Sequence, residues 1–415
     1  MNGLIHTLVL RMDPNLETGL FYALVTRYPG IARLLGITSG RIAVKFISTA
    51  EAGLRDSNLV NPVIGQEILK QLQIREDEAA GVAHFNVGGQ GFRGWDNHGR
   101  PDGDKICSLM VALEQANGDV LEHRQHLQDL VGAVMQNDVT GRRISRHPFN
   151  LRELVTSLGA LYPTDPMSCL EWIALAFYGL FHQAKASVKF EDLFSPEIIE
   201  TGAKEFLKGC VGRNIPPFKN LTETEAKQKW TWFCDLMAEA IENSKEAWTA
   251  AQAAIESAEK LNKRRRVQIN SLAQTVSVIE LITDSYKAPA AARKAGYNLI
   301  IHHNRDGHVQ IHSGIIPCAD GRKRAIHMGE IAGELRSAES WHQRKAIRQC
   351  QNLTGVGFTY FEDNSIIPWY FPHFATSVFN GTRSSRAVPR TSTPRSVIFE
   401  IVCKTAPRCS TIDRE

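Results

Sequence analysis

The sequence lacks three features that would assign a protein to a class at once. Its eight cysteines form no C-x-x-C pair, it has no apolar run of 18 residues, and its N-terminus has no basic segment followed by an apolar core. Scattered cysteines argue against a zinc ribbon or a disulfide framework, and a reducing cytosol is their simplest setting. We therefore expect a cytoplasmic protein that is neither secreted nor inserted in a membrane.

The chain also lacks a strong charge of either sign. Its 48 Lys and Arg stand against 44 Asp and Glu, which gives a formal net charge of +4. This balance permits nucleic acid as a partner without requiring it, so local patches must decide. A length of 415 residues and a hydrophobic content of 43% indicate a globular protein of two or three domains.

Strand and helix patterns alternate in the first 140 residues. We predict strands at residues 4–10, 41–48 and 81–87, and helices at residues 19–35, 105–116 and 122–136. Such alternation favours an α/β domain with a parallel sheet. The carboxyl ends of parallel strands meet at one edge, so we expect the polar residues at 11–17, 86 and 96–98 to converge there.

These polar residues resemble the motifs of the DHH phosphoesterase superfamily, and more narrowly its MYG1-like branch. The family pattern is H-x-x-x-D-x-D after the first strand, then D, then D-H-H, then a later D. The matching positions here are Arg11, Asn15, Glu17, Asn86, Asp96, Asn97, His98 and Asp138. The resemblance implies a DHH-like domain in which acidic and histidine side chains hold two manganese ions for phosphoester hydrolysis.

The chain keeps only part of that pattern. Asp96, His98 and Asp138 match, and they would be the catalytic residues of an active member. Amides cannot neutralise a dication, and Arg11 places a positive charge where a metal would sit. We therefore predict that no cofactor is bound. The alternative is Mn²⁺ held by residues that the pattern retains or approximates, which are Asp13, Glu17, Asp96, His98 and Asp138.

The substitutions convert the expected metal pocket into one rich in hydrogen-bond donors. We expect it to accept an anion through Arg11, Asn15, Asn86, Asn97 and Arg100. Arginines of a second segment, Arg383 and Arg386 followed by Arg390 and Arg395, lie close in sequence to the aromatic run at 369–374. This combination suits phosphate contacts and base stacking, although a solvated surface loop has the same composition.

The resulting prediction is a degenerate, non-catalytic relative of this family. Its partner would be nucleic acid, either RNA or single-stranded DNA, or another protein. The alternative is a manganese-dependent phosphodiesterase or 3′ to 5′ exonuclease that acts on RNA or DNA, as the resemblance implies. The oligomeric state is left open.

The rest of the chain changes in character twice. We predict a DHH-like domain at 1–140, a helical connecting region at 141–266 and a smaller α/β domain at 267–415. A long helical pattern at 222–266 ends in the basic run 263–266. The simplest role of that run is to complement the negative end of the helix dipole. The alternative is contact with phosphate or nuclear targeting.

A β-hairpin is predicted near residue 306. Strands at 297–303 and 308–313 flank an Asp306-Gly307 turn. The segment NLIIHHNRDGHVQI resembles the C-terminal part of MYG1-like proteins. Its histidines (His302, His303, His308 and His312) either form a polar face of the hairpin or bind a metal.

Overall fold

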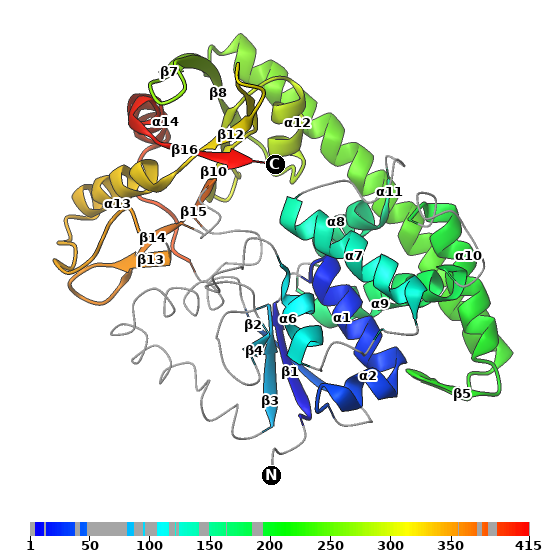
Figure 1. Cartoon of the computed structure of the whole chain (residues 1–415). Helices are drawn as coiled ribbons and strands as arrows, with labels where there is room; N and C mark the ends of the chain where they lie inside the picture. The colour runs from blue at the N-terminus through cyan, green and yellow to red at the C-terminus, as the bar shows by residue number, and fades with distance from the viewer. Residues whose placement is uncertain are drawn as a thin grey trace. The chain divides into compact units, whose positions relative to one another are not determined.

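In a computed structural model, the chain forms two compact units (Figure 1). The first comprises Met1–Ser48 and Pro62–Ser244, and the second comprises Thr49–Asn61 and Lys245–Glu415. The structure describes residues 5–11, 14–37, 42–47, 81–86, 94–95, 106–115, 121, 124–140, 149–162, 164–184, 194–355, 357–371, 376–380 and 388–414. Each unit is described by itself.

A parallel sheet begins the first unit, as the sequence predicts. Its strand order is β2-β1-β3-β4, and all three neighbouring pairs run parallel. The strands are β1 (Thr7–Arg11), β2 (Ala43–Ile47), β3 (Val82–Phe85) and β4 (Gly94–Trp95). Leu8, Val9 and Leu10 are fully buried, because β1 lies between two strands and both of its faces are covered.

Helices make up the rest of this unit. They are α1 (Leu16–Arg27), α2 (Pro29–Leu34), α6 (Ser108–Gln115), α7 (Gln125–Thr140), α8 (Leu151–Leu161), α9 (Pro166–Gln183), α10 (Pro196–Gly209) and α11 (Glu223–Lys260), with a short hairpin of β5 (Asn214–Ile215) and β6 (Phe218–Lys219). One hydrophobic core joins sheet and helices, from Leu8 in β1 to Phe233 in α11. Phe21 of α1 stacks on Phe85 of β3 with ring centroids 4.0 Å apart. The helices up to Ser244 are therefore packed with the sheet as one unit.

The end of α11 differs from the prediction. The helix stops at Lys260, and Arg264–Ile269 forms strand β7. Asn262 adopts a left-handed backbone with φ of 53°, and the N–H of Lys263 donates to the carbonyl of Ala258 at 2.8 Å. Asparagine tolerates this conformation and so ends helices. The interpretation of residues 263–266 as a basic helix terminus is wrong.

The second unit contains a seven-stranded mixed sheet of order β13-β14-β15-β10-β9-β8-β7. Its elements are β7 with β8 (Gln274–Ile282), α12 (Ala288–Lys294), β9 (Leu299–His303), β10 (Val309–Ser313), α13 (Gly329–Gln343), β13 (Gly357–Tyr360), β14 (Ile366–Phe371), β15 (Ser377–Asn380) and α14 (Arg395–Thr405). The predicted hairpin is confirmed, because β9 and β10 pair antiparallel and Gly307 has φ of 94°.

Helices cover both faces of this sheet. Val278, Leu299 and Ile301 face a core that includes Leu335 of α13 and Val402 of α14. Alternate residues of the same strands, such as Ile279 and Ile300, face a second core with α12 and the last part of α11. Strands buried on both faces read as continuous apolar runs. The chain is thus a mixed α/β protein, as predicted.

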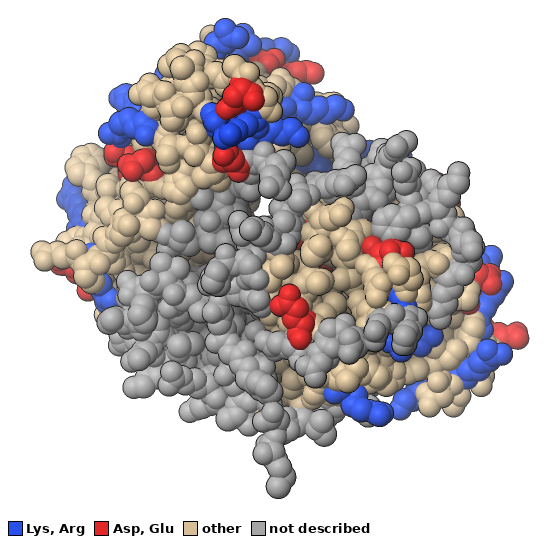
Figure 2. All heavy atoms as spheres, in the orientation of Figure 1, with Lys and Arg blue, Asp and Glu red and all other residues tan. Residues whose placement is uncertain are grey.

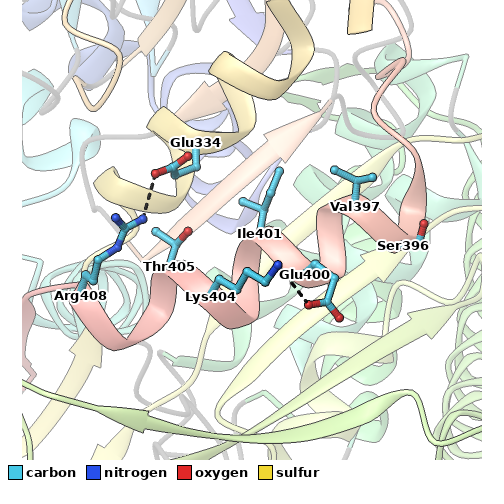
Figure 3. Close-up of a pocket in the computed structure, with 8 residues that line it drawn as sticks. All are labelled: Glu334, Ser396, Val397, Glu400, Ile401, Lys404, Thr405 and Arg408. Carbon is cyan, nitrogen blue, oxygen red and sulfur yellow. Dashed lines mark hydrogen bonds and ion pairs between the residues drawn. The ribbon is translucent and has the colours of Figure 1, made fainter. Parts of the chain in front are cut away.

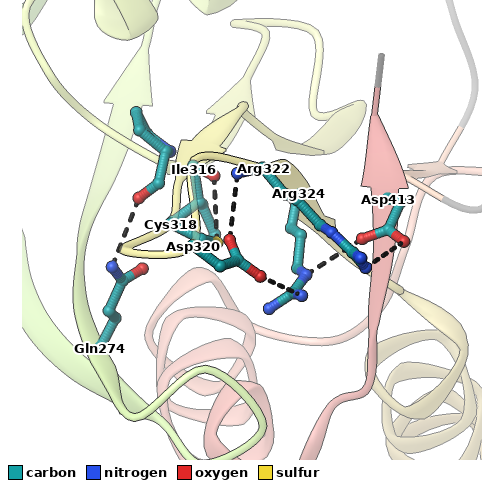
Figure 4. A network of polar contacts seen from close by, with 8 residues as sticks. Gln274, Ile316, Cys318, Asp320, Arg322, Arg324 and Asp413 are labelled. Carbon is teal, nitrogen blue, oxygen red and sulfur yellow. Dashed lines mark hydrogen bonds and ion pairs between the residues drawn. The ribbon is translucent and has the colours of Figure 1, made fainter.

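A smaller sheet of three strands fixes the end of the chain. Strand β12 (Lys323–Ile326) pairs with β11 (Ile316–Pro317) and with β16 (Thr411–Arg414). Arg324 bridges Asp320 at 2.7 Å and Asp413 at 3.0 Å, as Figure 4 shows. Among the described helices, none is both long and apolar enough to cross a membrane.

Candidate functional site

The parallel sheet places two predicted residues at one edge. Arg11 ends β1, and Asn86 follows the last residue of the neighbouring strand β3. Asn86 adopts φ of 55°, and its N–H donates to the carbonyl of Trp95 at 2.9 Å. Asn15 serves a local purpose, since its side-chain oxygen accepts from the N–H of Thr18 at 2.8 Å and caps α1.

Glu17 is the centre of this edge. Its side chain is only 2% exposed although it carries a carboxylate. Oε2 accepts a hydrogen bond from Nδ2 of Asn86 at 3.1 Å, and Oε1 accepts from the N–H of Leu109 at 2.6 Å. Leu109 lies in the first turn of α6, where backbone N–H groups lack helical partners and the helix dipole favours negative charge. Glu17 therefore ties the sheet edge to the start of α6.

A cysteine that the sequence reasoning missed completes the cluster. Cys107 is fully buried beside the start of α6. Burial raises the pKa of its thiol, and the charges of Glu17 and Asp138 raise it further. The thiol is therefore protonated at neutral pH and is not a nucleophile. Its position immediately before a helix was the available signal, but no cysteine spacing marked it.

The other predicted site residues are only partly described. Asp138 lies on α7 with an exposed side chain, close enough to act on the Cys107 thiol. Several lie outside the described residues: Asp13, Asp96, Asn97, His98, Arg100, Arg383 and Arg386. The structure thus brings together Glu17, Asn86 and the neighbourhood of Asp138.

This arrangement does not fit a metal ligand at Glu17. Both carboxylate oxygens accept protein N–H groups, and Asn86 turns its amide nitrogen, not its oxygen, toward them. A manganese ion prefers oxygen ligands that carry negative charge. Within the part of the chain that the structure describes, no group of three or more His, Cys, Asp or Glu is placed to hold a metal ion.

The four hairpin histidines are divided between the two faces of the sheet. His302 is opposite Gln310 and His303 is opposite Val309, so these two neighbours lie on opposite faces of the sheet. Nε2 of His302 donates to the carbonyl of Thr283 at 2.7 Å, and Nδ1 of His308 donates to that of Asn380 at 3.0 Å. These two rings thus have separate backbone partners.

Burial keeps two of these histidines neutral. Burial lowers the pKa of His302 below its usual range. It also lowers the pKa of His312 to about 3, with smaller contributions from Arg293 and His302. His303 lies beside Glu280, with Nε2 and Oε1 3.0 Å apart, and Lys263 contacts the other oxygen of Glu280 at 3.2 Å.

A basic pocket lies on strand β7 in the second unit. Its volume is about 560 Å³, and its lining comprises Glu259, Arg264, Arg265, Arg266, Ser277, Ala295, Gly296 and Tyr297. In the described part of the chain β7 is an outer strand of its sheet. Figure 2 shows many Lys and Arg side chains, interspersed with acidic ones, on the second unit. The pocket combines three arginines with one carboxylate.

Two of the arginines share a face of β7. Arg264 and Arg266 are two residues apart, so both point away from the face that carries Arg265. Arg265 is engaged by Glu400 at 2.8 Å and lies over the Phe399 ring. Arg264 makes a long ion pair of 4.0 Å with Glu259, whose oxygen also accepts from the Tyr297 hydroxyl at 2.5 Å.

Arg266 is the least engaged of the three. It has no ion pair or side-chain hydrogen bond with any residue that the structure describes, and it is exposed. A guanidinium in such a position is available to a phosphate or carboxylate in a bidentate arrangement. The face formed by Arg264 and Arg266, called the arginine face below, is therefore the described surface best suited to an anion.

A second cavity, of about 520 Å³, lies along α14 and is drawn in Figure 3. Its charged lining residues neutralise one another. Arg408 contacts Glu334 at 2.9 Å, and Lys404 lies 3.9 Å from Glu400. This cavity offers no excess of either sign, so it is a weaker candidate for an ionic ligand than the arginine face.

Comparison with known proteins gives no assignment. No family model matches the sequence, and no curated protein matches it. Among solved structures, the chain matches an uncharacterized protein from Helicobacter pylori G27 with 8% identity, over 98% of this chain and 99% of that one. The TM-score of that match is 0.28, so it supports no argument about fold or function.

Proposed function

We propose that this chain binds nucleic acid through its arginines and does not hydrolyse it. The observation that carries the proposal is the arginine face. Arg266 lines the pocket of about 560 Å³, is exposed, and has no ion pair or side-chain hydrogen bond with the described residues. Phosphate contacts from such side chains supply most of the sequence-independent affinity for nucleic acid.

The absence of catalysis is the second part of the proposal. It is supported by Glu17, whose two oxygens hold Asn86 and the start of α6, and by Arg11 at the end of β1. In an active relative of the DHH phosphoesterases these positions would carry metal ligands. We propose that they form a structural cluster in this chain, and that no Mn²⁺ is needed for binding.

Binding should be measured with labelled single-stranded RNA and DNA oligomers over a range of salt concentrations. The double variant Arg264→Ala/Arg266→Ala should bind about tenfold more weakly at low salt. The slope of log affinity against log salt should fall by about 1.4, because each phosphate contact contributes about 0.7. The variant should remain folded, since Arg264 is exposed and its ion pair with Glu259 is long.

A matched control removes the same charge elsewhere in the second unit. Arg305 and Arg322 are 82% and 65% exposed in surface ion pairs. Arg305→Ala/Arg322→Ala should bind almost as the parent does. An equal loss in both double variants would mean that only net charge matters, and a parent that does not bind at low salt would end the proposal in favour of a protein partner.

The alternative function is a manganese-dependent phosphodiesterase or 3′ to 5′ exonuclease. It is favoured by Asp96, His98 and Asp138, which match the family pattern. Incubating the oligomers with the protein and Mn²⁺ tests it directly. Cleavage that is lost in Asp96→Ala would establish the alternative, whereas intact oligomers with the parent protein support binding alone.

A further inference from the structure

A second surface of the same unit carries an exposed tryptophan among basic residues. Trp341, near the end of α13, is 76% exposed, whereas Trp369 of the same unit is fully buried. Its ring meets that of His342 edge to face at 4.7 Å. Most of the indole is in contact with solvent, so its burial contributes little to the stability of the fold.

The charged residues in the surrounding sequence are all cationic. No Asp or Glu occurs from residue 340 to residue 361, whereas Arg344, Lys345 and Arg348 all fall within it. Lys345 pairs with Asp363 at 2.8 Å. Arg344 and Arg348 have no ion pair or side-chain hydrogen bond with the described residues. Two guanidinium groups near Trp341 in sequence are therefore available to an anion.

The backbone holds this segment in a fixed position. Arg344 adopts a left-handed conformation with φ of 55° and ends α13. The segment then pairs with the end of β13 and the residues that follow it. The N–H of Arg348 donates to the carbonyl of Tyr360 at 3.2 Å, and the carbonyl of Ala346 accepts from the N–H of Glu362 at 2.9 Å. Fixed backbone lowers the entropy lost when a ligand binds.

The negative end of the α13 dipole explains part of this pattern. Cations stabilise the last turn of a helix, which accounts for Arg344 and Lys345. It does not account for an exposed tryptophan, nor for Arg348 beyond the helix. Glu362 and Asp363 lie across from this segment, and Asp363 is paired with Lys345. An aromatic face with flanking arginines is a combination that binds single-stranded nucleic acid, because bases stack on the ring and guanidinium groups contact phosphate.

We propose that Trp341 stacks against a base of single-stranded nucleic acid while Arg344 and Arg348 contact the adjacent phosphates. This inference rests on the proposed function and narrows it from any polyanion to strands with unpaired bases. A duplex keeps its bases stacked on one another, so it offers no free base to Trp341.

The test compares two ligands of equal length and charge. One is a single-stranded thymidine oligomer, and the other is a deoxyribose phosphate chain without bases. Trp341→Ala should bind the thymidine oligomer about tenfold more weakly and the base-free chain as the parent does. Trp341→Phe keeps a smaller ring, so its affinity for the thymidine oligomer should lie between those of the parent and Trp341→Ala. Arg344→Ala/Arg348→Ala should weaken both ligands.

Trp232→Ala is the matched control, because Trp232 is 50% exposed on α11 in the first unit. It should change neither affinity. If Trp341→Ala binds the thymidine oligomer as tightly as the parent, or loses affinity for both ligands equally, the stacking inference is wrong. Loss of affinity for the base-free chain in Arg264→Ala/Arg266→Ala would still support the proposed function in that case, so the two failures are separable.

Discussion

Glu339 accepts hydrogen bonds from five residues of the second unit, which are Gln343, Trp369, Thr391, Ser392 and Thr393. It is fully buried in α13. Its Oε1 accepts from the N–H of Ser392 at 2.7 Å, and its Oε2 accepts from the hydroxyl of Thr393 at 2.9 Å and the indole N–H of Trp369 at 3.3 Å. One charged side chain thus fixes the segment that leads into α14.

Arg336, one turn earlier on α13, is buried in a complementary way. Its guanidinium donates to the carbonyls of Trp369, Leu353, Gly355 and Gly357. Because all of its main partners are backbone carbonyls, Arg336 closes the ends of loops that would otherwise leave polar groups unpaired. Arg336 and Glu339 contact different atoms of the same residue, Trp369, and together they organise this face of the sheet.

Glu339→Gln should destabilise the protein by about 3 kcal/mol at pH 7, because an amide cannot accept from this many donors and adds a donor of its own. Urea unfolding measures the change. Burial raises the pKa of the Glu339 carboxyl, but hydrogen bonds from Ser392 and Thr391 outweigh it and lower the pKa below its usual range.

The lowered pKa sets the sign of the pH dependence. The stabilisation from Glu339 is complete above its unfolded pKa of about 4.3 and is lost as pH falls through the lower folded value. The gap between parent and variant should therefore narrow below about pH 4. The control Glu362→Gln, at an exposed position, should change little at either pH. A gap that is constant down to pH 2 would contradict this account.

At the scale of elements, two glycines allow α9 and α10 to touch. A Cβ atom at Gly179 would lie 2.5 Å from the backbone nitrogen of Ala203, and one at Gly202 would lie 2.5 Å from the carbonyl oxygen of Gly179. Neither contact is possible without a shift of backbone. The close approach of these helices therefore depends on the absence of side chains at both positions.

Gly179→Ala should destabilise the first unit by about 1–3 kcal/mol, because the helices must move apart. Gly159→Ala in α8 is the control, since a Cβ there meets nothing within 4 Å. Alanine favours a helix over glycine by about 1 kcal/mol, so the control should be neutral or stabilising. Thermal unfolding of both variants distinguishes packing from helix propensity; equal effects would refute the steric argument.

Sequence patterns located most elements where local signals were strong. The predicted strand at 81–87 contains β3, and the predicted helix at 105–116 contains α6. The predicted end of the long helix was wrong because Lys and Arg are good helix formers. Asn262 was the only local stop signal. Helical pattern alone gave no reason to place Arg264–Ile269 in a sheet.

The candidate site could be predicted only in part. Asn86 and Glu17 followed from strand ends and from loop position, and the structure joins them by a hydrogen bond. The contact between Glu17 and Leu109 joins residues 92 apart in sequence, so it depends on tertiary packing that no local pattern contains. The arginine face could not be predicted either, because the sequence pattern indicated a helix at residues 264–266, where the structure has strand β7.

At the scale of the whole molecule, the two units have separate cores. The core of the first extends from Ile5 to Ala240, and the second unit has cores of its own around β8 and β9. Independent cores unfold as separate cooperative steps unless the interface between them is large. Calorimetry should therefore resolve two transitions.

Two variants assign these transitions. Gly179→Ala should lower the transition temperature of the first unit alone, and Glu339→Gln that of the second alone. Each shift should be about 2–4 °C per kcal/mol for units of this size. If both variants move a single common transition, the units unfold as one and α11, which belongs to both, couples them.

The position of Arg264–Ile269 at a sheet edge has a consequence for solubility. An outer strand exposes backbone groups that can pair with a second copy of the same strand, which leads to aggregation. Two copies of β7 would bring three arginines from each chain together, and their mutual repulsion should oppose this pairing. A polyanion removes that repulsion. Concentrated protein should therefore become turbid when nucleic-acid and protein charges balance, and clear again when the polymer is in excess.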